Sequence, residues 1–198
     1  MSGPSYLLAL LPPDDVTERV VRWRERHGLH DAAAVPHITV KARSGLDADM
    51  DWQAAAQAAL ANHRPITFSF RAARIFPRGQ ALYLPVLGRG PVDLHLALLD
   101  AIRPAQRFGY EGPQMQPHLS VALARRGLDL AALLPDLQAE VADLAERPPH
   151  TAHQVALMRK PGPAAFTLWW TAGRWVRRSK ERGPVFSVLS LSPPPGLL

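Results

Sequence analysis

Two segments of the chain repeat one pattern of residue types: proline, histidine, an apolar residue, a hydroxyl residue and a second apolar residue. Residues 36–40 read PHITV and residues 117–121 read PHLSV. Gly-Leu-Asp then follows each copy, at 45–47 and again at 127–129. The short pattern is expected by chance about 0.01 times in a chain of this composition, so two copies indicate an internal duplication.

The repeated pattern fits a β-strand that carries reactive groups on one face. Alternate side chains of a strand point to opposite faces, so each histidine shares its face with the hydroxyl two positions later. The reactive face is predicted to comprise His37, Thr39, Lys41 and Arg43 in the first copy, and His118 and Ser120 in the second. If an approximate twofold relates the copies, these groups meet across a groove and form a phosphate site without a metal.

Paired imidazoles suit acid and base catalysis at a phosphorus centre. One neutral imidazole takes a proton from water, while the other, protonated, gives one to the leaving oxygen. Histidine serves both roles because its unperturbed pKa of about 6.5 lets both forms coexist near neutrality. Thr39 and Ser120 would donate hydrogen bonds to phosphate oxygens, and Lys41 would offset charge in the transition state. The pattern does not fix which histidine is the base.

Other uses of the histidines are less well supported by their spacing. A zinc site needs three or four ligands, and neither a carboxylate nor a third histidine stands at a useful distance from the repeated pattern. The chain has no cysteine, which excludes disulfides, thiol catalysis and zinc sites built on paired cysteines. The six histidines outside the pattern are expected to be solvated or structural: His27, His30, His63, His95, His150 and His153.

Composition describes an ordinary globular chain. It has 198 residues, of which 47% are hydrophobic and 20% charged, and these values predict one domain. The longest apolar run, residues 6–11, is far shorter than the roughly 20 residues of a membrane-spanning helix, so we expect no membrane partner. The absence of cysteine is compatible with the reducing cytoplasm, where we expect the protein to act as a monomer. The net charge is +6 and most of the cations are arginine, which favours a polyanionic partner. The alternative is that genome composition makes arginine abundant.

Turn residues divide the chain into alternating strands and helices, which predicts an α+β fold. Helices are expected after Asp14 up to about Gly28, at 51–62, at 92–102, and up to 146, where Pro135 starts or kinks the helix. Strands are expected at 6–10, 35–41, 66–76, 81–87, 118–123, 154–158 and 166–170. The first motif half is predicted at about 1–78 and the second at about 79–178, followed by a closing strand at 184–191 and a loose tail at 192–198.

The paired motif resembles that of the two-histidine (2H) phosphoesterases, and most closely their bacterial and archaeal 2'-5' RNA ligase-like branch. His37 and Thr39, and then His118 and Ser120, occupy the motif positions, and the resemblance spans nearly the whole chain. The opening strand followed by Pro12, Lys41 after the first motif, and residues 83–86 are also similar. Relatives often carry an arginine where Leu123 stands; Arg125 or Arg126 would substitute for it.

The resemblance implies a bilobed fold in which duplicated β-sheet lobes, related by a pseudo-twofold, enclose a central groove and carry outer helices. It also implies hydrolysis of RNA 2',3'-cyclic phosphate ends to 2'-phosphate with no cofactor and no metal, and in some relatives reversible 2'-5' ligation. The partner would then be RNA with a cyclic phosphate end or a 2'-5' linkage. The alternatives are a cyclic phosphodiesterase acting on a small nucleotide such as ADP-ribose 1'',2''-cyclic phosphate, and a non-catalytic RNA-binding module.

Further residues are expected to hold the substrate. A basic stretch that includes Arg174, Arg177 and Arg178 could track an RNA backbone, although a solvated loop would have the same composition. Phe76 and Tyr110 lie near predicted strand ends or loops, where an exposed ring could stack on a base, and core packing is the alternative. Arg43, Arg125 and Arg126 complete the set of candidate substrate contacts.

Overall fold

The structure is a computed structural model, and it describes residues 5–29, 35–160, 167–168 and 188–191. The described elements, in chain order, are β1 (Ser5–Leu10), α1 (Asp14–Arg26), β2 (Ile38–Lys41), α2 (Gln53–Ala61), β3 (Ile66–Phe70), β4 (Arg74–Ile75), β5 (Ala81–Leu87), α3 (Gly90–Ile102), β6 (His118–Leu123), α4 (Leu130–Glu140), the 3₁₀ helix η1 (Ala142–Ala145), β7 (His150–Ala152), β8 (Gln154–Lys160), β9 (Thr167–Leu168) and β10 (Val188–Ser190). The mixture of helices and strands confirms the α+β class.

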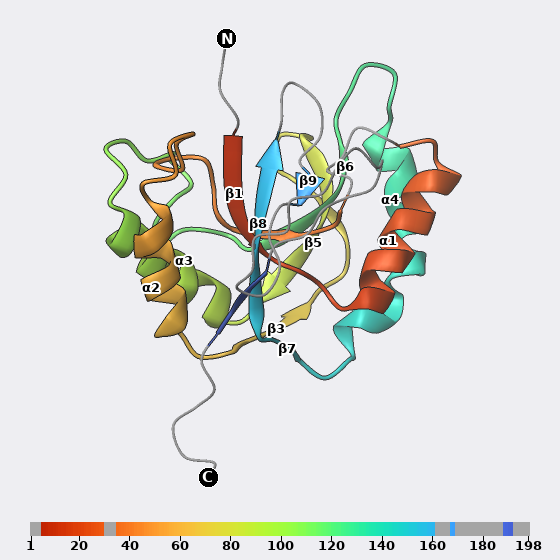
Figure 1. Cartoon of the computed structure of the whole chain (residues 1–198). Helices are drawn as coiled ribbons and strands as arrows, with labels where there is room; N and C mark the ends of the chain where they lie inside the picture. Colours follow the sequence, from red (N-terminus) through yellow and green to blue (C-terminus); the bar gives the residue numbers. More distant parts are fainter. Residues whose placement is uncertain (1–4, 30–34, 161–166, 169–187, 192–198) are drawn as a thin grey trace, which may run out of the picture.

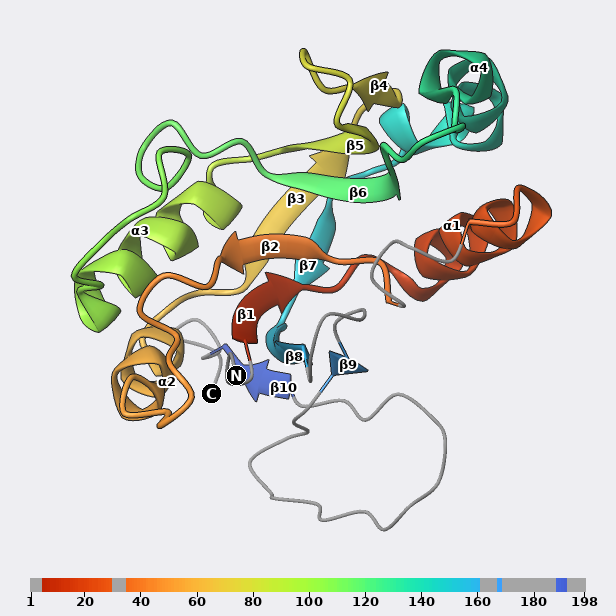
Figure 2. The same ribbon diagram turned by 90° about the horizontal axis from the view of Figure 1, so that it is seen from above.

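The strands form one curled antiparallel sheet. Its order is β10-β8-β1-β2-β6-β5-β3-β7, with β4 added to β5 and β9 added to β8. Helices α2 and α3 lie at one side of the curled sheet, and α1 and α4 lie at the other (Figure 1, Figure 2). The sheet therefore has one face turned toward the helices and one turned toward its own hollow.

A pseudo-twofold runs between the two central strands. β2 and β6 each carry one copy of the repeated motif, and they pair through equivalent motif residues, Ile38 and Leu119. β1 flanks β2 as β5 flanks β6. The outer strands are exchanged between the predicted halves, because β3 pairs with β5 and β8 pairs with β1. The two lobes are therefore interleaved rather than consecutive along the chain.

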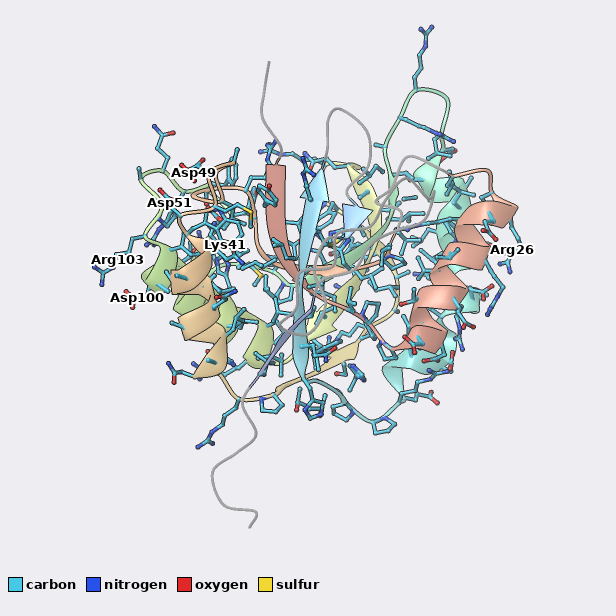
Figure 3. The ribbon with its side chains drawn as sticks, viewed as in Figure 1. Arg26, Lys41, Asp49, Asp51, Asp100 and Arg103 are labelled. Atoms are coloured by element: carbon cyan, nitrogen blue, oxygen red, sulfur yellow. The ribbon has the colours of Figure 1, made fainter. Side chains whose placement is uncertain are left out.

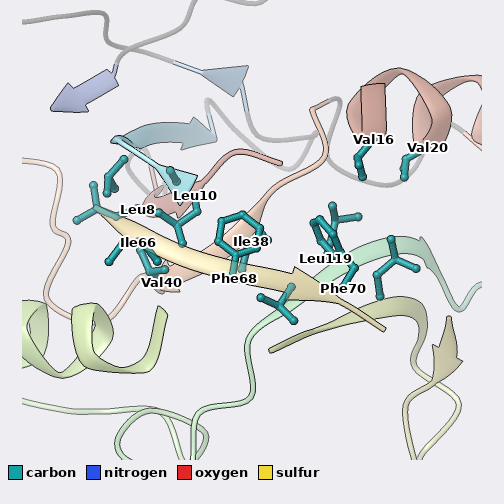
Figure 4. Close-up of a cluster of buried hydrophobic side chains, with 14 of the residues drawn as sticks. Leu8, Leu10, Val16, Val20, Ile38, Val40, Ile66, Phe68, Phe70 and Leu119 are labelled. Carbon is teal, nitrogen blue, oxygen red and sulfur yellow. The ribbon is translucent and has the colours of Figure 1, made fainter. Parts of the chain in front are cut away.

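The core lies between the sheet and its helices. Motif residues Ile38, Val40, Leu119 and Val121 are all buried, at the positions where the period-2 pattern predicts a core face. Other strands add Leu8, Leu10, Ile66, Phe68 and Phe70, and α1 adds Val16 and Val20 (Figure 4). Trp23 of α1 belongs to the same cluster. A smaller apolar cluster of Leu7, Ala9, Ala156 and Met158 lies on the opposite, hollow face. Burying the first face thus fixes which side chains reach the hollow.

Some predicted boundaries are wrong. The single strand expected over 66–76 is two strands, β3 and β4. The last helix does not start at Pro135: α4 begins at Leu130, because the Asp129 side chain caps it by accepting from the backbone N–H groups of Ala131 and Ala132, and Pro135 lies inside it. Helical structure continues close to residue 146 as expected, since η1 follows α4 and ends at Ala145. Of the strand expected over 166–170 the structure describes β9, and of the closing strand, β10. The tail at 192–198 lies outside the described residues.

No helix in the part of the chain that the structure describes is both long and apolar enough to cross a membrane.

Candidate active site

The register of the central strands brings the two motifs together. Because Ile38 pairs with Leu119 in an antiparallel ladder, His37 lies opposite Ser120, and Thr39 lies opposite His118. Side chains directly opposite each other in such a ladder have Cβ atoms about 5 Å apart. Each imidazole therefore has the hydroxyl of the other motif as its cross-strand neighbour, and the four groups form a compact square on the hollow face of the sheet.

Each motif histidine is locked by a carbonyl two residues before it. His37 Nδ1 lies 2.9 Å from the Val35 carbonyl oxygen, and His118 Nδ1 lies 2.8 Å from that of Gln116. A carbonyl can only accept, so both Nδ1 atoms carry a hydrogen and donate it. The proton-exchanging nitrogen of each ring is therefore Nε2. The proline between each histidine and its carbonyl partner fixes the turn that makes this bond.

A cavity of about 720 Å³ opens over the hollow face. Thr39, His118 and Ser120 are among its lining residues, whereas His37 is not. One end is lined by Phe76, Gln80, Ala81 and Leu123, and the other by Arg43, His95, Tyr110, Glu111, Gln114 and Met115. The volume lies within the usual range of about 300–1,000 Å³ for small-molecule sites. A ligand centred on the two motifs can therefore extend in both directions.

The two imidazoles differ in their electrostatic surroundings. Burial lowers the pKa of His37 to about 4; the hydrogen bond to Val35 opposes this shift, and the positive charges of Arg24 and His118 add to it. Burial also lowers the pKa of His118, opposed by its hydrogen bond to Gln116. His37 is therefore strongly held in the neutral form at neutral pH, as a general base requires.

Phe76 lies beside His118. Its ring stacks on that of Tyr83, with centroids 3.9 Å apart, and the His118 ring meets both rings at steep angles, 4.8 Å from Phe76 and 5.8 Å from Tyr83. These three distances put His118 at the side of the stacked pair rather than on its outer face. The pair thus packs against the imidazole and restricts its rotation.

Lys41 corrects the sequence-based expectation for the first motif. Ala9 pairs with Thr39 but Leu8 pairs with Lys41, so one extra residue of β2 forms a bulge and turns Lys41 to the core face that Leu8 shares. Lys41 is 0% exposed and its ammonium lies 2.8 Å from the Glu111 carboxylate, with further bonds to Ser44 and the Ala42 carbonyl. Figure 3 shows Lys41 inside the ribbon, whereas Arg26 and Arg103 project outward. The predicted phosphate contact is therefore wrong.

The same bulge occurs in the second motif, between the pairs Leu82–Ala122 and Tyr83–Ser120. At each bulge a helix side chain bonds the carbonyl of the last motif residue. Arg24 Nε donates to Val121 at 2.8 Å, and His95 Nδ1 donates to Val40 at 2.7 Å. Arg24 also donates to the Ser120 carbonyl at 2.8 Å. The two helix residues therefore brace the two motif strands at pseudo-equivalent points.

Arg24 and Glu111 were missed by sequence reasoning, and His95 was expected to be solvated or structural. Arg24 is next to Trp23 in the buried stripe of α1 and is only 6% exposed. Its role could not be predicted, because a single sequence does not show that the bulge in β6 needs a hydrogen-bond donor from α1. His95 is structural as expected, and it also accepts from the Gly112 N–H at 2.9 Å through Nε2.

The remaining predicted contacts divide into three groups. Arg43 and Tyr110 line the cavity, and their contact with a substrate stays a prediction. Arg125 and Arg126 are exposed and are not among the lining residues; Arg125 bonds the Gly28 carbonyl at 3.3 Å. Leu123 itself lines the cavity, so the cavity has no arginine at this position, and substitution by Arg125 or Arg126 stays a prediction. Arg174, Arg177 and Arg178 lie outside the described residues.

Within the described ranges there is no group of three or more histidine, aspartate and glutamate side chains positioned to hold a metal ion.

The curled sheet with a histidine and a hydroxyl on each of its two central strands defines a two-histidine phosphoesterase. The chain belongs to the 2'-5' RNA ligase superfamily, whose family model matches residues 12–163. No curated protein sequence matches it.

Solved structures of similar fold include three with low sequence identity. Escherichia coli LigT complexed with 3'-AMP is 15% identical, with 84% of this chain and 95% of that chain covered and a TM-score of 0.54. TT0787 of Thermus thermophilus is 16% identical, with 94% and 95% covered and a TM-score of 0.55. A phosphoesterase is 14% identical, with 84% and 94% covered and a TM-score of 0.56. At these identities the likeness shows a shared fold.

Proposed function

We propose that this protein hydrolyses the 2',3'-cyclic phosphate at RNA ends to a 2'-phosphate, using its two motif histidines and no metal. The observation that carries the proposal is the cross-strand square of His37, Ser120, Thr39 and His118, in which both Nδ1 atoms are bonded to carbonyls. Thr39, Ser120 and His118 line the cavity, and His37 lies across the strands from Ser120. Two imidazoles that each present Nε2 to one site can move two protons around a single phosphorus atom. The shared fold with LigT, solved in complexes with 3'-AMP and with phosphate, supports a nucleotide phosphate as the ligand.

The reaction assigns different tasks to the histidines. Neutral His37 accepts a proton from water as the water oxygen bonds to phosphorus. The bond between phosphorus and the 3'-oxygen breaks, and that oxygen takes a proton from the His118 imidazolium, which leaves a 3'-hydroxyl and a 2'-phosphate. His37 is the base because its pKa is about 4. The negative charge of the bound cyclic phosphate favours the protonated form of His118.

Other cavity groups stabilise the charge that develops on the phosphate. Thr39 and Ser120 donate hydrogen bonds to its non-bridging oxygens, and each is one strand away from the imidazole of the other motif. Arg43 is the cation that lines the described cavity and takes the charge-neutralising role first expected of Lys41. With an RNA 5'-hydroxyl in place of water, the same proton transfers join RNA through a 2'-5' linkage.

The experiment is a ring-opening assay in EDTA with an oligonucleotide that ends in a 2',3'-cyclic phosphate, followed by ³¹P NMR of the product. We expect conversion to the 2'-phosphate, lost in His118→Ala and kept in His63→Ala, whose exposed imidazole bonds a neighbouring carbonyl outside the cavity. ADP-ribose 1'',2''-cyclic phosphate is tested in parallel. Opening of that compound alone would replace RNA as the substrate, and RNA binding without any ring opening would refute catalysis.

A further inference from the structure

We infer that the loop between α3 and β6, residues 103–117, forms a nucleobase pocket that prefers adenine or cytosine, which carry an amine at N6 or N4, over guanine or uracil, which carry a carbonyl oxygen at the corresponding O6 or O4 position. The inference rests on the proposed function, because it names the nucleoside part of the substrate whose phosphate lies at the two motifs. The loop supplies Tyr110, Glu111, Gln114, Met115 and Gln116 to the cavity lining. It therefore forms most of the wall at the end of the cavity away from Phe76.

An exposed aromatic ring stands at this end of the cavity. Tyr110 is 59% exposed although its ring is large and mostly apolar. It stacks on Phe108 with centroids 5.3 Å apart and planes 14° apart, and the Arg43 guanidinium lies 5.7 Å from the centre of the Phe108 ring. A tyrosine supported from behind by a second ring, with a free face beside a phosphate site, can stack on a base.

The loop is rigid, which matters because a stacking platform must keep its orientation. Glu111 is 5% exposed and ties the loop to β2 and the residues after it, since its carboxylate receives hydrogen bonds from Lys41, Ser44 and the Phe108 backbone N–H. The Gly112 N–H donates to His95 on α3. These buried bonds order the loop in the free protein, so a ligand does not have to supply the entropy cost of ordering it on binding.

Gln114 gives the pocket its selectivity. Its Nε2 donates to the Gly109 carbonyl at 3.1 Å and to the Glu111 carbonyl at 2.8 Å. Both partners are acceptors, so they fix the amide with the nitrogen toward the loop and use both of its hydrogens. The side chain can then offer a ligand only the acceptor Oε1, since no described residue donates to it. An acceptor pairs with the amine of adenine or cytosine and opposes the O6 of guanine or O4 of uracil.

The loop also ends at the catalytic machinery. Gln116 lines the cavity, and its carbonyl is the group that locks His118 Nδ1. A base held by Tyr110 and Gln114 thus lies against the same segment that orients the imidazole. The distance from base pocket to phosphate site is set by a few residues of one anchored loop, so the preference should appear in mononucleotides as well as in RNA.

The test is binding of the four nucleoside 2'-monophosphates by isothermal titration calorimetry, which needs no turnover. The native protein should bind 2'-AMP and 2'-CMP about tenfold more tightly than 2'-GMP and 2'-UMP. A difference of this size is typical when one hydrogen bond, here from the base amine to Gln114 Oε1, is replaced by the repulsion of two acceptor oxygens. Gln114→Leu should remove this preference. Tyr110→Ala should weaken all four by a similar factor, whereas Tyr110→Phe, which keeps the ring, should not.

Three outcomes separate the inference from the proposed function. Equal affinity of the native protein for all four nucleotides would overturn the selectivity, even if the cyclic phosphate is hydrolysed. A Gln114→Leu variant that weakens all four equally and keeps the ratio would assign Gln114 a purely structural role and would also overturn it. A clear preference for 2'-AMP and 2'-CMP without ring opening of any cyclic phosphate would sustain the base pocket and refute the hydrolase.

Discussion

Replacing Lys41 and Glu111 singly and together tests whether the lysine of the first motif is a structural residue or a phosphate ligand. The two side chains form a fully buried ion pair, and each has further bonds: Lys41 to Ser44 and the Ala42 carbonyl, and Glu111 to Ser44 and the Phe108 N–H. Removing one partner of such a pair leaves an uncompensated buried charge, which typically costs about 3–5 kcal/mol. Both Lys41→Met and Glu111→Met should lose this much in free energy of unfolding.

The double variant should be more stable than the sum of the single losses predicts. With both charges gone, the largest remaining cost is the unpaired Phe108 N–H, about 1–3 kcal/mol. Urea unfolding of the four proteins then gives a coupling free energy of about 2 kcal/mol or more. The pKa of Glu111 adds a pH signature. Burial alone would raise it, but the bonds from Lys41, Ser44 and Phe108 hold it below its ordinary value of 4.5. The stability that Glu111 contributes should therefore be fully present above about pH 4.5 and fade as the pH falls through the folded-state pKa.

Activity of the double variant decides between the two roles. If Lys41 is structural, kcat/KM for a cyclic-phosphate substrate should stay within about tenfold of the native value at a temperature where the variant is folded. Loss of a cation that contacts the transition state costs about 100- to 1,000-fold. A folded Lys41→Met/Glu111→Met protein with a loss of that size, and no coupling in the unfolding data, would refute the reasoning.

Three further predictions concern the catalytic square and its supports. The pH profile of kcat/KM should be bell-shaped and unaffected by EDTA. It should rise through a pKa of about 4 as His37 loses its proton and decline at higher pH as His118 loses its proton, with the pKa of this second limb below 6.5 because burial lowers it. A rising limb near 6.5 would contradict the assignment of His37. Arg24→Gln removes a positive charge close to His37, so the rising limb should move to higher pH, and Arg24→Lys should move it less; an unmoved limb in Arg24→Gln would remove Arg24 from the account. His95→Gln should lower the free energy of unfolding in urea by about 1–3 kcal/mol, because the bonds to Val40 and Gly112 are lost. It should leave both limbs of the pH profile of kcat/KM in place, and a shifted limb would show that His95 acts on the site.

Sequence periodicity predicted the face that each motif residue occupies as far as the bulge. His37, Thr39, His118 and Ser120 alternate with buried Ile38, Val40, Leu119 and Val121 as a period of two requires. The prediction failed at Lys41, because one extra residue in β2 reverses the faces beyond Val40. A bulge depends on how a strand meets its neighbour, and the amino acids of one strand do not carry that information.

Long-range partners were likewise beyond the sequence. The helix stripe of α1 was predicted from Val16, Val20 and Trp23, and these residues are buried, but the contact of Arg24 with Val121 joins segments 97 residues apart. Glu111 is an isolated acid in a loop of glycine and proline, with no local pattern to mark it. The interleaving of the two halves could not be predicted for the same reason. β3 pairs with β5 and β8 pairs with β1, and these pairings depend on how the whole core packs and not on the residues of either motif.

The central claim is that His37 and His118 act together on one phosphorus atom, and single-turnover rates of the two alanine variants and their double variant test it most directly. Each single variant should lose about 100- to 10,000-fold in ring opening. The double variant should be no more than about tenfold slower than the worse single variant, because groups that act in one step are not additive. Near-native turnover in either single variant, or losses that multiply in the double variant, would contradict the account.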